Sequence, residues 1–529
     1  MKRMPFLFGL ILLALLPLTF LHQLITASAA PNALRYVAPG GDCGGMSPCY
    51  AQVQTAVTAA AAGDEIRIAQ GVYTGTNTAS LFNGQTVMTQ VVFISQSVQL
   101  HGGYTTADWE NSDPAAHPTI LDAEGNGRVI SILGGGTITL TGLTLTGGYA
   151  EEGGGLYVEN GFEQSITFTL QNSIVASNTA AHRGGGLDIR FSSARISGNQ
   201  IVNNHALADF GGGGGISLLV NPGSFYNIDG NVIVNNHTAG TGGGIEFVGG
   251  LADELVVVEG NELVSNTAVY GGGLFAYTIQ YLHVNNNRIQ NNHSQQGGGI
   301  GFLSSFDISL ENNLIQGNIV SAGDDGSAFI NGQGGGLALD FVHPLTMTNN
   351  VIADNQAVGG DGISINTDSD VRMFHNTLAR NQGSAIQVLG AQQPGDHCYS
   401  FTFTCTYLTM SNTLLISHAV GISITGLATS VQADGLLWHN TPVTTAVFTT
   451  ANTILDIQNE YWGDPLFAVD GYHIMTGSAA IDRGIVTAVL TDIDGQTRPQ
   501  GTAPDLGADE LYPTSPTIRH TIYLPLLQK

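Results

Sequence analysis

An asparagine frame that repeats along the middle of the chain is the strongest constraint on its fold. Seven segments share the pattern Asn-x-(Ile/Leu)-x-x-Asn, with weaker copies at Asn172 and Asn412. Consecutive copies start 26 to 37 residues apart, a period typical of solenoids. The seven strong copies begin at Asn199, Asn231, Asn261, Asn287, Asn313, Asn350 and Asn376.

Most units also contain a glycine triplet followed by a short alternating strand. The triplets begin at Gly153, Gly184, Gly213, Gly242, Gly271, Gly297 and Gly334. A unit of this length has room for two or three short strands but none for an intervening helix, which excludes leucine-rich repeats and βα arrays. We therefore predict a coil in which each strand pairs in parallel with its equivalent in the next turn.

Stacking of equivalent residues at about 4.8 Å explains the unusual composition. Asparagines at one corner of every turn can hydrogen-bond to one another as a ladder, and asparagine tolerates left-handed corners. Glycine supplies positive φ and close backbone approach, which accounts for 71 glycines in 529 residues. We predict that the seven asparagines are structural and not ligands.

The first residues have the features of an export signal. Lys2 and Arg3 precede an apolar run from Phe6 to Leu21, and Ala27-Ser28-Ala29 fits a cleavage site, so we expect residues 1–29 to be removed. We expect no transmembrane segment in the mature chain. In an exported protein the two local cysteine pairs, Cys43 with Cys49 and Cys398 with Cys405, predict two disulfide-closed loops.

The charge excludes one class of partner. The chain has 15 Lys and Arg against 41 Asp and Glu, a net charge of −26. Such a chain repels phosphate backbones, so we expect no nucleic-acid binding.

The repeats resemble the right-handed parallel β-helix units of the pectin-lyase-like superfamily. The segment from Tyr36 to Gly75 resembles the N-terminal cap of exported bacterial β-helix proteins, with a disulfide loop and a short helix at 50–62. The segment from Asp464 to Glu510 resembles the closing part of "choice-of-anchor" surface proteins. The resemblance implies an all-β, single-stranded β-helix with two caps, on a bacterial surface or secreted. The expected parts are an N-terminal cap (30–90), the coil (91–455), a C-terminal cap (456–512) and a spacer with an apolar tag (513–529).

Members of this superfamily include lyases and hydrolases, so we searched for their catalytic residues. Asn366-Thr367-Asp368 and Asp324-Asp325 occur in the reverse of the polygalacturonase order, and the Gly-His-Gly and Arg-Ile-Lys motifs are missing. A lyase would need clustered acids that bind calcium beside a basic residue. The densest charge cluster contains Asp354, Asp361, Asp368, Asp370 and Arg372. An enzyme using it stays an alternative, with calcium the one cofactor left open.

We predict no metal site elsewhere. Two imidazoles in adjacent turns, at His205 and His237, make a poor site without a carboxylate. The sequence TDIDGQ from Thr491 resembles the start of a calcium loop but lacks the third acidic position and the distal glutamate.

A row of outward side chains gives the leading functional hypothesis. In each strand after a triplet, the first and third residues should point inward and the second and fourth outward. In the middle turns this row turns apolar, with Val248, Phe275, Tyr277 and Leu303 as candidate contacts. The alternative is that a loop, such as Thr76 to Thr89, covers the row. We expect a non-catalytic protein that contacts a polysaccharide, an envelope glycan or a surface protein, as an adhesin. A polysaccharide lyase or hydrolase and a structural surface-layer component are the alternatives.

Overall fold

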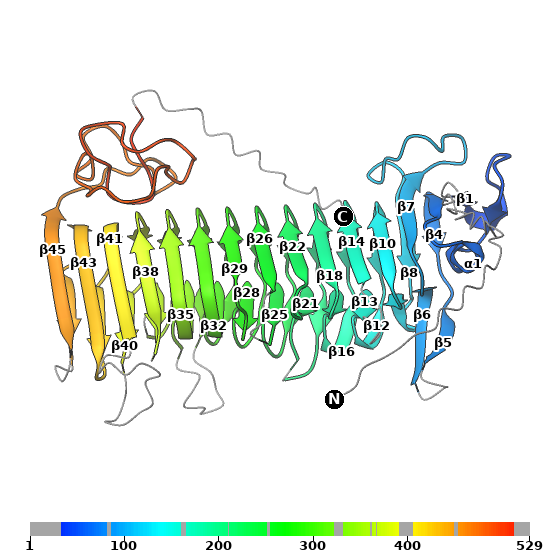
Figure 1. The fold of residues 1–529 in the computed structure, drawn as a ribbon, viewed down its shortest axis with the longest axis horizontal. Coiled ribbons are helices and arrows are strands. Elements are labelled where there is room, and N and C mark those ends of the chain that lie inside the picture. The colour runs from blue at the N-terminus through cyan, green and yellow to red at the C-terminus, as the bar shows by residue number, and fades with distance from the viewer. Residues whose placement is uncertain are drawn as a thin grey trace, which may run out of the picture.

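The chain winds into a long coil of short parallel strands, with each turn stacked on the one before (Figure 1). The computed structural model describes residues 33–512 except 82–85, 160–165, 210, 251–253, 322–331, 360–361, 367, 391–405 and 449–452. The predicted signal, the spacer and tag, Asp361, and the pair Cys398 and Cys405 lie outside the described residues.

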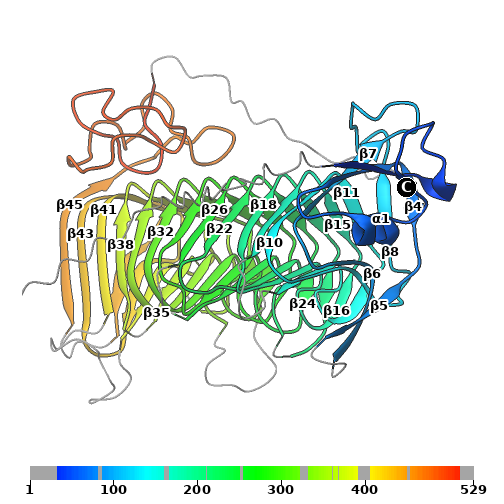
Figure 2. The same ribbon diagram turned by 45° about the vertical axis from the view of Figure 1, so that its right-hand side comes forward.

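Successive turns contribute strands to four stacks, which Figure 2 shows aligned along the coil. The first stack follows the glycine triplets and consists of β6 (Thr86–Ile94), β9 (Arg128–Leu133), β13 (Leu156–Glu159), β17 (Leu187–Arg190), β21 (Ile216–Leu219), β25 (Ile245–Val248), β28 (Leu274–Tyr277), β32 (Ile300–Glu311), β35 (Leu337–Thr348), β37 (Ile363–Ile365), β40 (Ser384–Leu389), β42 (Val420–Thr425) and β44 (Val443–Val447).

The second stack is β1 (Leu34–Val37), β3 (Glu65–Ala69), β7 (Val98–Tyr104), β10 (Gly136–Thr141), β14 (Ile166–Gln171), β18 (Ser193–Ser197), β22 (Phe225–Asp229), β26 (Leu255–Glu259), β29 (Leu282–Asn285), the second halves of β32 and β35, β38 (Asp370–Phe374), β41 (Thr406–Ile416), β43 (Thr429–His439) and β45 (Ile454–Trp462). The long strands β32 and β35 therefore belong to both the first and the second stack.

The third stack is β4 (Gly71–Tyr73), β8 (Thr119–Asp122), β11 (Leu143–Thr146), β15 (Ile174–Ala176), β19 (Gln200–Val202), β23 (Val232–Val234), β27 (Glu262–Val264), β30 (Arg288–Gln290), β33 (Leu314–Gln316), β36 (Val351–Ala353) and β39 (Thr377–Ala379), followed by the ends of β41 and β43. The fourth, shortest stack is β12 (Tyr149–Glu152), β16 (Thr179–Arg183), β20 (His205–Ala206) and β24 (His237–Thr238), with β31 (His293–Ser294) pairing β34 (Ile319–Val320).

Asparagine ladders form two of the corners. Between the second and third stacks, Asn199 Nδ2 donates to Asn231 Oδ1 at 3.0 Å, and the same bond recurs through the other predicted asparagines up to Asn376. A second ladder, from Asn178 to Asn381, uses the second asparagine of each frame. Both ladders are buried and leave the amide groups satisfied within the wall.

Two details of the predicted corners are wrong. The left-handed residue is the one before a ladder asparagine, such as Asn203 or Asn286, and not the ladder residue itself. The weak copies at Asn172 and Asn412 are therefore shifted by one residue, because both have positive φ. Ser173 takes the ladder position, where its backbone N–H donates to Asn199.

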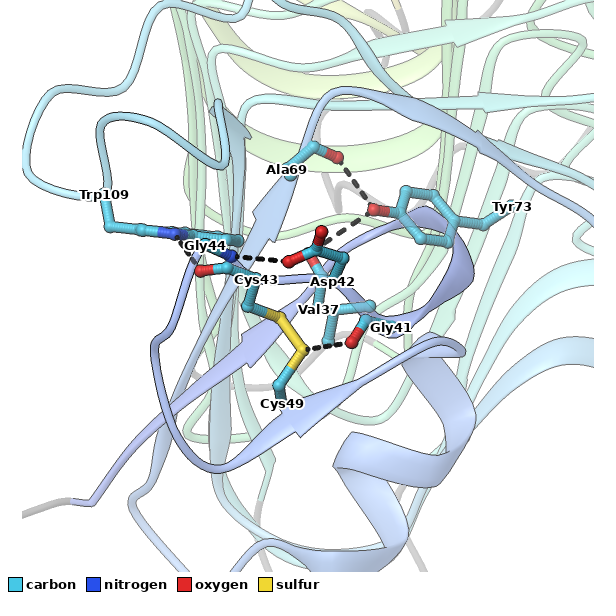
Figure 3. Close-up of a disulfide and its surroundings, with 9 residues drawn as sticks. All are labelled: Val37, Gly41, Asp42, Cys43, Gly44, Cys49, Ala69, Tyr73 and Trp109. Atoms are coloured by element: carbon cyan, nitrogen blue, oxygen red, sulfur yellow. Dashed lines mark hydrogen bonds between the residues drawn. A yellow bond between two sulfur atoms is a disulfide. The ribbon is translucent and has the colours of Figure 1, made fainter.

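The N-terminal cap closes one end of the coil around the disulfide Cys43–Cys49 (Figure 3). Trp109 packs against Tyr36 and donates from Nε1 to the Cys43 carbonyl at 3.1 Å. Also in this region are the 3-10 turn η1 (Pro39–Gly41), β2 (Cys49–Tyr50), β5 (Asn77–Leu81) and the helix α1 (Val53–Ala59). The helix is shorter than the predicted 50–62, and parallel stacking already begins at β1 and β3, inside the range predicted as cap.

The segment after β45 lies along the side of the last turns and not over their open end (Figure 1). Its apolar residues pack on outward residues of the third stack, including Val351, Ala379 and Leu414. The side-chain amide of Asn412 makes two hydrogen bonds of 2.8 Å with the backbone of Ile485. The coil continues to Trp462, past the predicted boundary at 455.

A single apolar core runs inside the coil from Val37 to Trp438. It consists of alternate, inward-pointing residues of the strands together with Val53, Ala56 and Val57 of α1, most of them fully buried. No helix in the described part of the chain is long and apolar enough to cross a bilayer.

Candidate functional site

The outer face of the first stack has an aligned row of residues, which we call the floor of the groove. The row consists of Ser131 of β9 followed by the second residue of each later strand, namely Tyr157, Asp188, Ser217, Glu246, Phe275, Gly301, Ala338 and Ser364. The side chains of this row point away from the core, yet they are buried. Phe275, predicted as an exposed outward contact, is only 7% exposed, and that prediction of exposure is wrong.

The glycine triplets explain this burial. The first glycine of each triplet has φ between 58° and 67°, and a Cβ on Gly271 would meet the backbone of Leu274 and the side chain of Phe275. The chain therefore turns so sharply that the residue before the triplet lies beside the second residue of the strand. Tyr270 and Phe275 show the result, with ring centroids 6.2 Å apart. The residues before the triplets form one wall, in the order Glu152, Arg183, Gly212, Thr241, Tyr270, Gln296 and Gln333.

Matched charges fill the N-terminal half of the groove, which we call the charged half (β9 to β25). Arg190 Nη2 lies 2.8 Å from Asp188 Oδ2 and also contacts Glu152. Glu246 is paired with Arg183 at 3.3 Å, and its carboxylate also accepts from Ser217 and Thr241. Burial raises the pKa of Asp188 to about 6, against the opposing effect of Arg190.

The start of the charged half is closed by an arginine over an aromatic ring. Arg128 is buried, with its guanidinium 4.7 Å from the Tyr157 ring centroid, and it donates to backbone carbonyls of Glu152 and Gly153. Its Nη1 also donates to Ser131 at 3.1 Å. These contacts join the wall to the floor of the groove and leave the arginine little freedom to contact a ligand.

The arginine–carboxylate pairs of this row end at Glu246, and the groove then opens into a cavity of about 490 Å³, which we call the aromatic half (β28 to β35). Its lining comprises Thr241, Tyr270, Phe275, Gln296, Gly301, Phe302, Leu303, Ala338, Asp340 and Phe341. The floor is hollow here because its row holds Gly301 and Ala338 after Phe275. A Cβ on Gly301 would lie only 3.1 Å from the Phe275 ring, so the missing side chain is what leaves the ring accessible from this side.

Two polar groups sit in this apolar cavity. Gln296 donates from Nε2 to Asp340 Oδ2 at 2.8 Å, and Asn366 is a further hydrogen-bond partner of Asp340. Oε1 of Gln296 is buried and has no hydrogen-bond partner within the described parts of the chain. Burial raises the pKa of Asp340 to about 6, and hydrogen bonds from Asn366 and Gln296 oppose the shift. A buried acceptor without a donor costs free energy that a ligand hydroxyl could recover.

The other predicted contacts lie at the rim. Tyr277 is 40% exposed, and Val248 and Leu303 are half-buried, but of these three only Leu303 lines the cavity. The segment predicted as an alternative cover, Thr76 to Thr89, forms the hairpin of β5 with β6, which pairs with β9 several turns away. Phe275 is covered instead by Tyr270, which belongs to the same turn of the coil.

The acidic cluster predicted for an enzyme is distributed over different corners of the coil. Asp354 follows the third stack, where Arg380 binds it at 2.8 Å and also donates to the Gly471 carbonyl of the C-terminal segment. Asp368 lies 3.7 Å from His343 between the first and second stacks. Asp370 is paired with Arg372 at 2.7 Å. The Asp354–Arg380 pair therefore anchors a neighbouring segment and faces no common site with Asp368.

Sequence patterns missed the groove wall and one histidine cluster. The signal for Tyr270 and Gln296 is their shared position directly before a glycine triplet. Among the described residues, a group of three donors that could hold a metal occurs at His473, Asp494 and Asp509, where no metal was predicted. The motif TDIDGQ, set aside as an incomplete calcium loop, contains Asp494 and was the available signal.

Comparison with known proteins gives one family match. Residues 252–435 match the family described as "Right handed beta helix region". No curated protein matches the sequence.

The similar solved structures share low sequence identity with this chain. A pectate lyase has a TM-score of 0.33 at 15% identity, over 92% of this chain and 98% of the other. A tailspike protein of bacteriophage CBA120 has a TM-score of 0.38 at 12% identity, over 80% and 61%. The A-module of a mannuronan C-5 epimerase from Azotobacter vinelandii has a TM-score of 0.35 at 13% identity, over 76% and 93%. The family match and the parallel strand stacks together show that the chain folds as a right-handed parallel β-helix.

Proposed function

We propose that this chain is a non-catalytic β-helix protein that binds an uncharged glycan in the aromatic half of the groove. The observation that carries the proposal is the pair Gln296 and Asp340 in a cavity walled by aromatic rings. The unpartnered Oε1 of Gln296 and the carboxylate of Asp340 are both acceptors, which suit the hydroxyl donors of a sugar. Tyr270 and Phe275 offer apolar surface for a sugar ring.

Charge favours an uncharged glycan over a uronate. Among the described residues, the lining of the cavity includes Asp340 but neither arginine nor lysine. The chain as a whole carries a net charge of −26. A polyanionic sugar would meet repulsion from both, whereas the hydroxyl groups of a neutral sugar would donate to Asp340.

The test is binding of the purified full chain to a panel of immobilised neutral and uronate polysaccharides. We expect retention on a neutral polymer, at least a tenfold loss of affinity in F275A and in Q296A, and no change in F225A. Phe225 is the matched control, because it is an exposed aromatic residue of the second stack, away from the groove. Equal binding by F275A and the native protein, or a preference for uronates, would contradict the proposal.

One observation favours hydrolysis as a second candidate. Asp188 and Asp340 lie in the same groove and both have a pKa raised to about 6, a property of general acids. Asp188, however, is fully buried and held by Arg190. New reducing ends released from a neutral polysaccharide, and lost in D340N, would establish this candidate in place of the non-catalytic one.

For location, we propose export and display at a bacterial surface as an adhesin. The support is the predicted signal at residues 1–29, the predicted disulfide that forms at Cys43–Cys49, and the terminal sequence TIYLPLLQK. Surface biotinylation of intact cells should label the chain. Finding it only in the cytoplasmic fraction would contradict the proposal.

A further inference from the structure

The C-terminal segment, residues 463–512, is held together mainly by side chains. After β45 it has no helix or strand in its described residues, and only isolated bridges join Phe467 with Ile474 and Thr491 with Thr497. Hydrogen bonds from backbone N–H groups to side-chain carboxylates take the place of regular strand pairing in this segment. Asp492, for example, accepts from the backbone of Asp494 and Gln496. A segment of this kind gains much from any cross-link between its distant parts.

His473 lies at the meeting point of three such parts. Its Nδ1 is 2.6 Å from Asp470 Oδ2, within the same turn, and its Nε2 is 2.7 Å from Asp494 Oδ2. Asp509, from the end of the segment, accepts from the backbone N–H of Ile474 at 2.6 Å. One ligand atom each of His473, Asp494 and Asp509 lies within 4.8 Å of the others.

This geometry matches that of a metal-binding histidine and not only that of a surface ion pair. A histidine ligand usually donates its second ring nitrogen to a carboxylate, which orients the ring. Asp470 has that position here, and the Asx-type bonds from the backbone of Tyr472 and His473 fix its own carboxylate. The Tyr472 ring, 4.4 Å from the imidazole, further limits its rotation.

We propose that His473, Asp494 and Asp509 bind one divalent transition-metal ion of the zinc type, with Asp470 as the positioning residue. The ion takes the place of the proton between Nε2 and Asp494, and that proton leaves to solvent. Bound there, it cross-links the turns around 473, 494 and 509 and fixes the segment against the side of the coil.

The donor set selects the class of ion. An imidazole nitrogen with two carboxylates suits zinc and the other divalent transition-metal ions, whereas calcium and magnesium prefer oxygen donors alone. Charge also favours a cation, because carboxylate oxygens of Asp494 and Asp509 lie within 4.8 Å of each other. Asp494 is the most exposed of the three donors and gives the ion a route of entry.

The experiment is a titration of the metal-free full chain with Zn2+ by calorimetry, with Ca2+ as the second arm. We expect one saturable Zn2+ site per chain and at least a tenfold weaker affinity in D494N and in H473Q. The matched control is H205Q, since the His205 and His237 rings, 5.9 Å apart, form a histidine pair that could also bind zinc. Zn2+ should also protect the segment 463–512 from proteolysis in the native chain and in H205Q, but not in D494N.

Three results would overturn the proposal. They are no saturable Zn2+ binding, equal binding by D494N and H473Q, or loss of binding in H205Q. Binding of Ca2+ in preference to Zn2+ would reject the class of ion. If H473Q does not fold, D494N decides the question, because it keeps the shape of an exposed side chain and its circular dichroism without metal should match that of the native chain.

Discussion

The charged and aromatic halves of the groove are built from successive turns of the same repeat, but they bury their outward side chains in opposite ways. In the charged half, Asp188 and Glu246 each have an arginine partner, and the space above the floor is filled. A methyl group on Gly212 would overlap the Glu246 carboxylate. In the aromatic half the floor residue shrinks to Gly301 and then Ala338, and the hydrogen-bond partners of Asp340 in the described parts of the chain are the amides of Gln296 and Asn366. A buried charge pair makes the loss of either partner costly, whereas a hollow with an unmatched acceptor is suited to a ligand.

The largest expected effect comes from breaking a charge pair in the charged half. R190M leaves the buried Asp188 carboxylate without its cation, which typically costs about 3–5 kcal/mol of unfolding free energy. Urea denaturation measures it. Glycan binding at native temperature should persist, because the cavity is several turns away.

The matched control is R195M, which removes an exposed arginine 3.5 Å from Asp229. Such surface pairs contribute less than about 1 kcal/mol. If R190M and R195M destabilise the chain equally, the charged half is not a structural network. If R190M abolishes glycan binding in a chain that remains folded, the two halves do not act separately.

Filling the hollow should abolish the difference between the halves. G301V places methyl groups against the Phe275 ring and into the cavity, so we expect glycan affinity to fall at least tenfold, about 1.4 kcal/mol. Affinity on the neutral polysaccharide measures this. V248A, one turn before the cavity, changes a residue outside its lining and should leave affinity unchanged. The reverse ranking of the two variants would move the binding site to the charged half.

The pH dependence of binding should follow Asp340. Its pKa is raised to about 6, so it is protonated at pH 5 and ionised at pH 7.5. The ionised form is the stronger acceptor, and we expect affinity to rise severalfold between these values and then level off. In D340N the affinity should be lower and independent of pH over this range.

The stability of the fold should change with pH in the opposite direction to the glycan affinity. A carboxyl whose pKa is raised in the folded state stabilises the fold when protonated, and this contribution is lost as pH rises through about 6. The folded chain should therefore gain affinity while losing a little stability over the same interval. An affinity that falls as pH rises would contradict the role of the Asp340 carboxylate as acceptor.

The smallest effect is expected at the rim. Tyr277 is 40% exposed and lies outside the cavity lining, so Y277A should weaken binding about two- to threefold. Competition with free glycan measures such a change. A loss as large as that of F275A would place the ligand on the outer edge of the strands and not in the cavity.

Some of this architecture could be predicted because it depends on residues that recur in every turn. The Asn-x-(Ile/Leu)-x-x-Asn frame determines the ladder, since equivalent asparagines stack whatever the rest of the turn contains. The inward first and third residues of the strands follow from the two-residue period of a β-strand. The helix boundary and the one-residue shift at Asn172 were wrong, because ends and corners depend on local φ and not on the period.

The groove was predicted only in part. Strand alternation correctly directs Phe275 away from the core, but its burial depends on Tyr270, which comes from across a glycine corner. Alternation considers a strand by itself and contains no information on what the neighbouring corner brings beside it. For the same reason Gly301, which looked like an ordinary strand residue, leaves the cavity open.

The sequence by itself determined the coil, its ladders and the closed disulfide at Cys43–Cys49, because these arise from periodic or near-neighbour residues. Only the tertiary structure decided where the groove is filled by charge pairs and where it contains a cavity. It alone also brought His473, Asp494 and Asp509 together and placed their segment on the side of the coil. These features join residues with no fixed spacing, and their contacts are set by how one turn or segment packs on another.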